Sequence, residues 1–326
     1  IDNAVWGLVS SQAAVNIERP KGVSRIVVAG DFPTDQSSTR TPTTVNASLV
    51  IGDNQIFSAQ AKMAIQGQSS VNSRKKGYKL TFSNPVTGDD MTVKVGSWLP
   101  RQKIDLKGYN GWKGNMQDSS YVRDVISAEI WRNIRRANTY PDNMIAPFEA
   151  WGNNSLPSTG ALFSTDGFPC ELWDDAGNFL GQYVFRTTNF NDDYLIDKKN
   201  PLHYLIQPQH LGVSSWYSFD STGWDFSSPK MKGYDSQDDI SKKFPKVYDT
   251  ANRLFEWWNS VNSGTADIST QYQYIRLAGW IDYIIHAEVT FKRDGMVNNL
   301  MLISYDATET SGLWDVMPYD LDETLG

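Results

Sequence analysis

Hydrophobic and polar residues alternate along much of the first 110 residues, and β-branched side chains are frequent there. Five stretches show this pattern most clearly, at residues 24–30, 45–52, 78–82, 91–96 and 103–106. Alternation with a period of two is typical of strands, because successive side chains point to opposite faces of a sheet. Turn-forming segments separate the stretches, such as GDN at 52–54 and NPVTGDD at 84–90. The sequence therefore predicts a β-rich first part.

The hydrophobic period changes to that of a helix between residues 119 and 137. Apolar side chains recur there at helical spacing, at Val122, Val125, Ile126, Ile130 and Ile134. Asp118 or Ser119 can cap this helix, and basic residues gather in its last turn, where they complement the helix dipole. We therefore expect one long helix after the strands.

The second half of the chain predicts one further strand, two core helices and a hairpin. The strand covers residues 181–190, and residues 207–236 have the composition of long loops. One helix begins near Pro245 and extends to about residue 260, and the other covers about 269–289. Their apolar positions, which we expect in the core, are Val247, Leu254, Trp257 and Trp258 in the first and Ile275, Ala278, Ile281, Ile285 and Val289 in the second. The hairpin strands are 300–305 and 313–319. The whole order predicts an α+β fold, with a β-rich part at 1–190 and a second part at 191–326.

Composition narrows the classes of protein that this chain can belong to. Its 326 residues include 12 Trp, 15 Tyr and 14 Phe, which indicates a folded chain with a large core. The formal net charge of −7 argues against a nucleic-acid binder, since such proteins are usually basic. No run of 18 apolar residues occurs, so we expect no membrane span. Cys170 is the single cysteine, so no intrachain disulfide can form.

Acidic residues close the sequence in the segment YDLDETLG, at 319–326. Asp320 and Asp322 stand two apart just after the second hairpin strand, and RDGMVNN at 293–299 places Asp294 and Asn299 just before the first. Phosphoryl transfer needs a carboxylate near the attacking hydroxyl and hard oxygen ligands for Mg²⁺. Asp294 suits the first role, and Asn299, Asp320 and Asp322 suit the second. The alternative is that Asp320 and Asp322 face water in a turn and cap a following helix.

Basic residues that could face phosphates lie in the β-rich part. Lys75, Lys76 and Lys79 lie on or beside the strand YKLTF, and Arg123 and Glu129 lie on the long helix. A strand lysine paired with a helix glutamate is the arrangement found in protein kinases. Alternation places Lys79 on the face opposite to Tyr78 and Leu80. The alternatives are that the lysines are solvated and that Arg123 bonds a neighbour on the helix surface.

Other catalytic chemistries have little support in the sequence. His203, His210 and His286 share no metal-ligand spacing, and His286 in its apolar helix is interpreted as a core residue with satisfied hydrogen bonds. No nucleophile elbow, P-loop or glycine-rich dinucleotide motif occurs, so a nucleotide site would be atypical. Cys170 has no evident basic partner that would activate its thiol.

Four segments, read in order, resemble the CotH family, the spore-coat protein H group of atypical protein kinases. They are IQGQSSVNSRKKGYKL (65–80), DSSYVRDVISAEI (118–130), GQYVFRT (181–187), and RDGMVNNLMLISYD (293–306) with LWDVMPYDLDETLG (313–326). Together they extend over about residues 24–326, and the last pair is the most specific. The family domain usually continues beyond its last motif. We therefore expect the chain, which opens on Ile1 and stops at Gly326, to be a segment of a longer one.

The resemblance implies a two-lobed atypical protein-kinase-like fold, with a β-rich N-terminal lobe and a helical C-terminal lobe. It implies ATP and Mg²⁺ as cofactors and phosphoryl transfer to a hydroxyl of a protein substrate. Asp294 matches the catalytic-loop aspartate, Asn299 the following asparagine and Asp320 the metal-binding aspartate, with Asp322 as its companion. Lys75, Lys76 and Arg123 match basic positions near the nucleotide. The chain departs from the family pattern at Gln66, Gln68, Asp124, Thr187 and Tyr319.

Some members of the family act as adhesins, so a non-catalytic binding or structural module is the alternative. Such a module would belong to a surface, secreted or virion-associated assembly rather than to the cytoplasm. Its partner would be a protein or a glycan, because aromatic residues in loops can stack on sugars or anchor a protein. The aromatic residues concerned are Trp216, Tyr217 and Trp224. Packing of the loops is the simpler explanation of these residues.

Overall fold

The computed structural model divides the chain into two compact units. The residues it describes are 14–67, 70–84, 86–109, 120–137, 160–189, 191–208, 219, 224–229, 240–292, 295 and 298–325. The first unit comprises Ile1–Ile126 and Ser158–Phe190, and the second comprises Ser127–Pro157 and Asn191–Gly326. Helix α1 (Arg123–Arg136) begins in the first unit and continues in the second. Residues 127–157, which lie within the predicted first part, group with the second unit.

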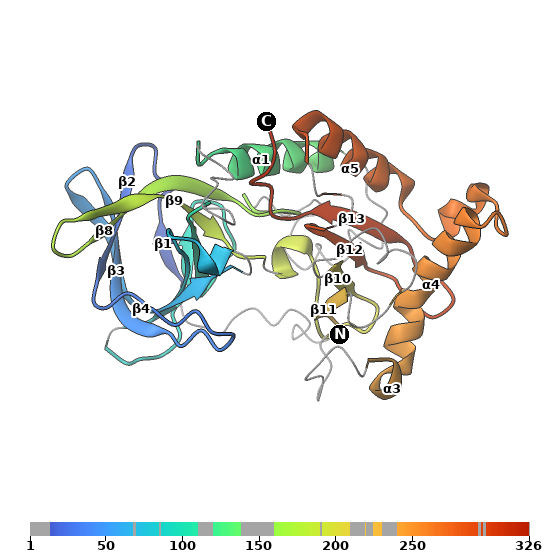
Figure 1. The fold of residues 1–326 in the computed structure, drawn as a ribbon, viewed down its shortest axis with the longest axis horizontal. Helices are drawn as coiled ribbons and strands as arrows, with labels where there is room; N and C mark the ends of the chain where they lie inside the picture. The colour runs from blue at the N-terminus through green and yellow to red at the C-terminus, as the bar shows by residue number, and fades with distance from the viewer. Residues whose placement is uncertain are drawn as a thin grey trace. The chain divides into compact units, whose positions relative to one another are not determined.

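The first unit contains a closed β-barrel (Figure 1). Its strands, in order around the barrel, are β2 (Ser24–Ala29), β3 (Thr43–Ile51), β4 (Asn54–Gln66), β5 (Gly77–Ser83), β7 (Lys103–Lys107), β9 (Phe179–Thr187) and β8 (Gly167–Asp174). Neighbouring strands are antiparallel except β2 and β8, whose parallel pairing joins Ser24 to Cys170 and closes the barrel. Strands β1 (Val15–Ile17) and β6 (Val93–Val95) form a separate parallel pair. A short 3₁₀ turn, η1 (Ser70–Asn72), precedes β5.

Apolar side chains fill the barrel because alternate residues of each strand point inward. Ala61 of β4, Leu80 of β5 and Ile104 of β7 are fully buried in this core. On β5 the burial alternates, and Lys79 lies on the other face from Tyr78 and Leu80, which confirms that prediction. The strand pattern thus fixes which side chains can reach the outer face of the barrel.

The second unit is built on a four-stranded antiparallel sheet. Its strand order is β11 (Trp224–Ser228), β10 (Tyr204–Pro208), β12 (Leu300–Ser304) and β13 (Trp314–Pro318). The helical elements of this unit, besides most of α1, are η3 (Asn191–Tyr194), α3 (Ile240–Lys243), α4 (Pro245–Asn262), η6 (Ile268–Gln273) and α5 (Leu277–Thr290). The predicted hairpin is confirmed by the β12–β13 register, which pairs Leu300 with Pro318. Overall, the chain is a strand-rich mixture of α and β structure, as the sequence predicted.

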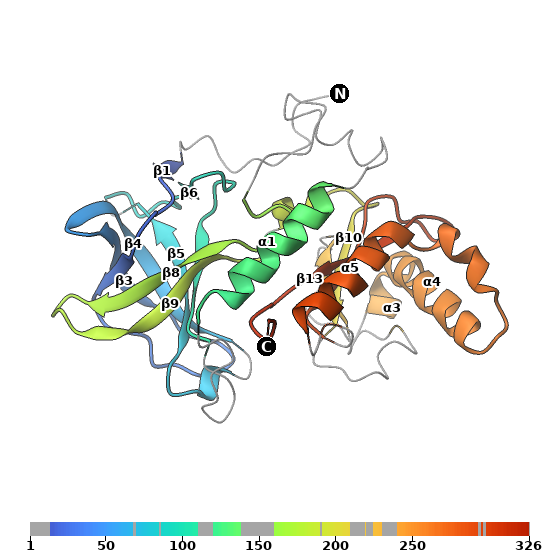
Figure 2. The same cartoon turned by 90° about the horizontal axis from the view of Figure 1, so that it is seen from above.

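Helix α5 lies along β13 and packs on the second unit's part of α1 (Figures 1 and 2). The indole of Trp280 donates to the carbonyl of Trp314 at 3.0 Å. His286 is buried, with Nε2 2.9 Å from the carbonyl oxygen of Ser127, which confirms that it is a core residue. Its hydrogen bonds are only partly satisfied, because the buried Nδ1 has no partner among the described residues. Gly279 lies against the buried ion pair of Arg135 and Asp315.

The predicted core face of α5 is wrong. Ile281, Ile285 and Val289 are 46%, 51% and 62% exposed. The buried side of the helix carries smaller or polar residues instead, namely Gly279, Tyr283, His286, Ala287 and Thr290. A small residue is needed at Gly279, because a Cβ there would lie 2.0 Å from Asp315 Oδ1. In α4, by contrast, Leu254 and Trp257 are buried as predicted.

Candidate functional site

Asn299 and Asp320 lie together at one end of the β12–β13 hairpin. Asn299 immediately precedes β12, and Asp320 follows the last residue of β13 by two positions. The amide of Tyr319 donates to the carbonyl of Asn299 at 2.9 Å, which extends the strand pairing by one step. The hairpin therefore places the two polar residues that the sequence assigned to a metal on neighbouring strand ends.

The backbone at both residues has a conformation that is uncommon for residues other than glycine. Asn299 has φ of 52° and Asp320 has φ of 51°, in the left-handed region. Such a conformation costs on the order of 1–3 kcal/mol and persists only where the surrounding structure holds it. Asn and Asp adopt this region more readily than other residues, and seven further non-glycine residues of the described chain share it. The pair therefore adds to the residue chemistry of this turn and does not identify a site alone.

Lys292, two residues after the end of helix α5, binds the turn that carries Asp320 and Asp322, which we call the acidic turn. Its buried ammonium donates to the carbonyls of Tyr319 at 3.1 Å and Asp320 at 3.4 Å. Gly295 lies close to the same lysine, since a Cβ there would be 2.8 Å from the Lys292 side chain. The hydroxyl of Tyr283 donates to the carbonyl of Gly295. Sequence reasoning did not single out Lys292, although a lysine ending an apolar helix beside an acidic loop was a usable sign.

Asp322 is 6% exposed, so the alternative in which it faces water is wrong. The chain around it is tied down, because Thr324 Oγ1 donates to the carbonyl of Leu321 at 2.6 Å and the amide of Leu325 donates to the carbonyl of Thr290 at 2.5 Å. Asp320 is half-buried. Two carboxylates two residues apart are therefore held at one end of the hairpin, one of them buried and the other half-buried.

The donor atoms at the hairpin end suit a hard cation. Asn299, Asp320 and Asp322 offer amide and carboxylate oxygens, and Mg²⁺ usually takes one or two carboxylates together with waters and phosphate oxygens. Within the part of the chain that the structure describes, no three His, Cys, Asp or Glu residues form a ready metal cage. Asp294, the expected catalytic base, lies outside the described residues.

Lys75, in the first unit, is the most constrained of the predicted basic residues. Its ammonium donates to the hydroxyl of Tyr121 and the carbonyl of Gln182, and it lies 4.3 Å and 4.4 Å from the ring centres of Tyr121 and Tyr183. Burial lowers the pKa of Lys75 to about 8. The residue is therefore a positioned cation whose charge can change near neutral pH.

The other predicted basic residues have different surroundings. The Lys76 ammonium donates to the carbonyl of Val71 at 2.7 Å and so braces the segment that leads into β5. Lys79 is paired in register with Asp105 on the outer face of the barrel. Arg123 is half-buried and is the first residue of α1. Lys75 and Lys76 line one pocket and Lys79 does not, so the structure does not bring all three lysines together.

A strand–helix ion pair exists, but its residues are not the predicted ones. Arg186 of β9 and Asp124 of α1 are both buried, with Nη1 and Oδ2 2.5 Å apart. The hydroxyl of Tyr109 donates to the same Asp124 oxygen at 2.6 Å. Glu129 is exposed and forms no ion pair within the described residues. The expected pair of a strand lysine with Glu129 is therefore not present.

Asp105 completes this buried polar cluster on the outer face of the barrel. Gln66 Nε2 donates to Asp105 Oδ2 at 2.8 Å, and Arg186 Nη2 lies 3.9 Å from the same oxygen. Burial raises the pKa of Asp105, against the opposing charges of Lys79 and Arg186. Sequence reasoning missed Asp105 and Arg186 because, in an alternating strand, residues that point away from the core are expected to be solvated.

Three residues at which the chain differs from the CotH pattern have structural roles here, and one of them is Asp124 in its pair with Arg186. Gln66 binds Asp105 as described, and the Thr187 hydroxyl accepts a hydrogen bond from the amide of Asp166 at 3.0 Å. Gln68 lies outside the described residues. Both neutral side chains therefore make hydrogen bonds in this structure.

The aromatic residues behind the binding-module alternative are only partly described. Trp224 is fully buried and packs its ring 5.0 Å from that of Phe255, so it cannot stack on a glycan. Trp216, Tyr217 and His210 lie outside the described residues.

No model of a known protein family matches the chain, and no curated protein sequence matches it either. In the described residues, no helix has the length and apolar character needed to cross a bilayer.

Proposed function

We propose that the chain is a two-lobed, CotH-like atypical kinase domain that transfers a phosphoryl group from ATP to a hydroxyl of a protein substrate. The observation that carries the proposal is the end of the β12–β13 hairpin. There, Asn299 and Asp320 both have left-handed backbone conformations on neighbouring strand ends. Asp322, two residues later, is buried, and Lys292 donates a hydrogen bond to the carbonyl of Tyr319 in the same turn. The order of these residues along the chain is that of a kinase catalytic loop followed by a metal-binding aspartate.

Each residue has a chemical role in the proposal. Asp294 accepts the proton of the attacking hydroxyl, and Asn299, Asp320 and Asp322 would hold Mg²⁺, which neutralises charge on the phosphates when it is bound. Lys292 is a positioning residue, because its hydrogen bonds go to backbone carbonyls of the turn.

Calorimetric titration of ATP with and without Mg²⁺ tests the nucleotide site. The wild type should bind ATP only with Mg²⁺. Asp320→Asn should weaken that binding by about tenfold or more, since loss of even an outer partner of a bound metal costs roughly 10–100-fold. Glu288→Gln is the matched control, because Glu288 is an exposed acidic residue of α5 in the same unit. It should bind like the wild type.

Transfer of labelled phosphate from ATP to a mixture of peptides containing Ser, Thr and Tyr tests the chemistry. Asp294→Asn should retain Mg²⁺-dependent ATP binding and lose transfer. If the folded wild type binds no ATP, or binds it equally well in the presence of a chelator, the proposal fails. The non-catalytic binding module is then the better account.

A further inference from the structure

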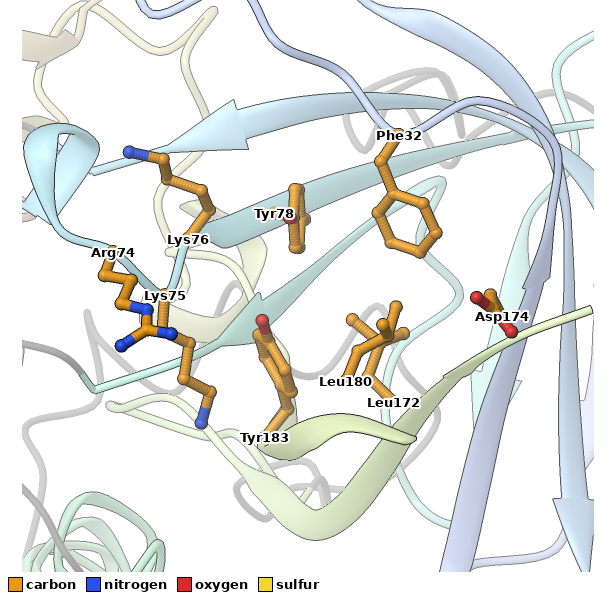
Figure 3. Close-up of a pocket in the computed structure, with 9 residues that line it drawn as sticks. All are labelled: Phe32, Arg74, Lys75, Lys76, Tyr78, Leu172, Asp174, Leu180 and Tyr183. Atoms are coloured by element: carbon orange, nitrogen blue, oxygen red, sulfur yellow. The ribbon is translucent and has the colours of Figure 1, made fainter. Parts of the chain in front are cut away.

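The mouth of the barrel holds a pocket of about 420 Å³ (Figure 3). Strands β2 and β8 are parallel and both end at this mouth, whereas β5 and β9 begin there. Phe32 follows β2, and Tyr78 and Tyr183 come from β5 and β9. The volume is within the range of roughly 300–1,000 Å³ that is typical of small-molecule sites, which often occur in the mouths of barrels.

The inner part of this pocket is apolar and aromatic. Leu172, Tyr78 and Tyr183 are buried in the barrel core, and Phe32 meets Tyr78 edge to face with ring centres 5.7 Å apart. The rings of Tyr78 and Tyr183 are 6.2 Å apart. Figure 3 shows these rings around a common space that Leu180 also faces. Such walls favour an apolar ring or a short aliphatic chain.

Two phenol groups in the pocket have hydrogen-bonding capacity to spare. Neither the hydroxyl of Tyr78 nor that of Tyr183 bonds to any residue that the structure describes, although both side chains are buried. Burial raises the pKa of both residues, so the phenols stay protonated and can donate at neutral pH. A ligand oxygen in the pocket could therefore accept a hydrogen bond from each phenol.

Positive charge lies on one side of these phenols. Arg74 and Lys75 lie together at one side of the pocket, and Asp174 lies at the opposite side (Figure 3). The exposed guanidinium of Arg74 makes no hydrogen bond or ion pair with any described residue. Asp174 is already engaged by Asn178, whose amide and Nδ2 donate to it at 2.7 Å and 2.8 Å. An anionic group would therefore be drawn to the Arg74 side.

We propose that the barrel mouth binds a small amphipathic anion. Its apolar body would lie between Phe32, Leu172 and Leu180, and its carboxylate or phosphate would accept from Tyr78 and Tyr183 and face Arg74 and Lys75. The inference goes beyond phosphoryl transfer, because every residue of the pocket belongs to the first unit and the acidic turn belongs to the second.

Two fluorescent naphthalene probes separate the apolar part of the site from the charged part. The anionic probe is 8-anilinonaphthalene-1-sulfonate and the neutral one is N-phenyl-1-naphthylamine. Tyr78→Phe, Tyr183→Phe and Arg74→Gln should each weaken binding of the anionic probe by about tenfold, the equivalent of one lost charge-assisted hydrogen bond, and leave the neutral probe unaffected. Leu180→Trp should exclude both probes by filling the pocket.

Lys62→Gln and Asp320→Asn are the controls. Lys62 is exposed on β4 of the same barrel, and Asp320 belongs to the acidic turn, so both variants should bind the probes like the wild type. Octanoate and phenyl phosphate then compete separately with the anionic probe. Displacement by either one supports the proposal and identifies the head group. Displacement by neither, or equal probe affinity in the wild type and the Tyr→Phe and Arg74→Gln variants, overturns it.

Discussion

Substitution of Gly279 by alanine should destabilise the second unit, although alanine is the better helix former. Gly279 is the point where α5 crosses the ion pair of Arg135 and Asp315, both of which are almost completely buried. A Cβ at Gly279 would lie 2.0 Å from Asp315 Oδ1 and 2.6 Å from Arg135 Nη1. Neither atom can yield without opening the ion pair or moving the helix away from it.

The magnitude follows from two opposing terms. Alanine gains at most about 1 kcal/mol over glycine, because Gly279 is the third residue of α5 and that value applies to a helix interior. Breaking a buried ion pair costs about 3–5 kcal/mol, because a charge is left without compensation. We therefore expect Gly279→Ala to lower the free energy of unfolding by about 2–4 kcal/mol. In a unit of this size that corresponds to a fall in Tm of roughly 4–15 °C.

Urea and thermal unfolding, followed by circular dichroism and tryptophan fluorescence, measure the effect. Ala278→Gly is the control, because Ala278 is the exposed neighbour of Gly279 and its replacement costs helix propensity alone, about 1 kcal/mol. A Gly279→Ala variant as stable as the wild type, or more stable, would refute the close crossing of α5 over the ion pair.

Three further predictions concern the second unit. Lys292→Met should lower the free energy of unfolding by about 2–3 kcal/mol, because the carbonyls of Tyr319 and Asp320 lose a charged hydrogen-bond donor. The same variant should weaken Mg²⁺-dependent ATP binding. Unchanged urea midpoints together with unchanged calorimetric titrations would contradict this prediction. Burial lowers the pKa of His286, so below about pH 6.5 the unfolded chain takes up a proton that the folded one does not, and stability should fall as the pH drops from 7.5 to 5.5. His286→Gln should make that fall shallower, and an identical pH profile would exclude the role of His286. Ile285→Lys should change stability by no more than about 0.5 kcal/mol, since the side chain is exposed, and a loss of several kcal/mol in urea unfolding would restore the core interpretation of this residue.

Strands were predictable from sequence where large apolar residues alternate with polar ones, and the barrel was not. Strand β4 was missed because its inward positions include Ala59 and Ala61, whose small side chains give little contrast with polar neighbours. Strand β8 was missed because Pro169 reads as a strand breaker, although it is tolerated at an exposed position of the strand. Without these two strands, the remaining pattern does not reveal a closed ring.

Periodicity located helix α5 but not the side it buries. The helix is amphipathic in the sense that one face is aliphatic, yet that face is exposed and the buried face is made of Gly279, His286 and other small or polar residues. The buried face is set by the contact of Gly279 with the Arg135–Asp315 ion pair. These residues are far apart in the sequence, so no local pattern predicts that they meet. The register of a helix on its partner is a tertiary property.

Some features of the candidate site could be predicted from the sequence and others could not. Asn299 and Asp320 could be predicted as neighbours because a hairpin brings its own two ends together. Two contacts could not be predicted, because each joins elements that are distant in the sequence. They are the hydrogen bond from Lys292 to the acidic turn and the ion pair of Arg186 with Asp124. Residue chemistry therefore suggested the kind of site, and only the fold showed which other side chains bond to its residues.

The closure of the barrel has a consequence for the order in which the chain can fold during synthesis. Strands β2, β3, β4, β5 and β7 leave the ribosome before α1, but β8 and β9 are made after it, and β2 has no neighbour on one side until β8 arrives. Throughout that interval the nascent sheet exposes two unpaired edges, which are templates for pairing with other chains. A fragment ending at residue 126 would retain those open edges permanently. We expect it to aggregate, whereas the same strands extended to residue 190 can seal themselves.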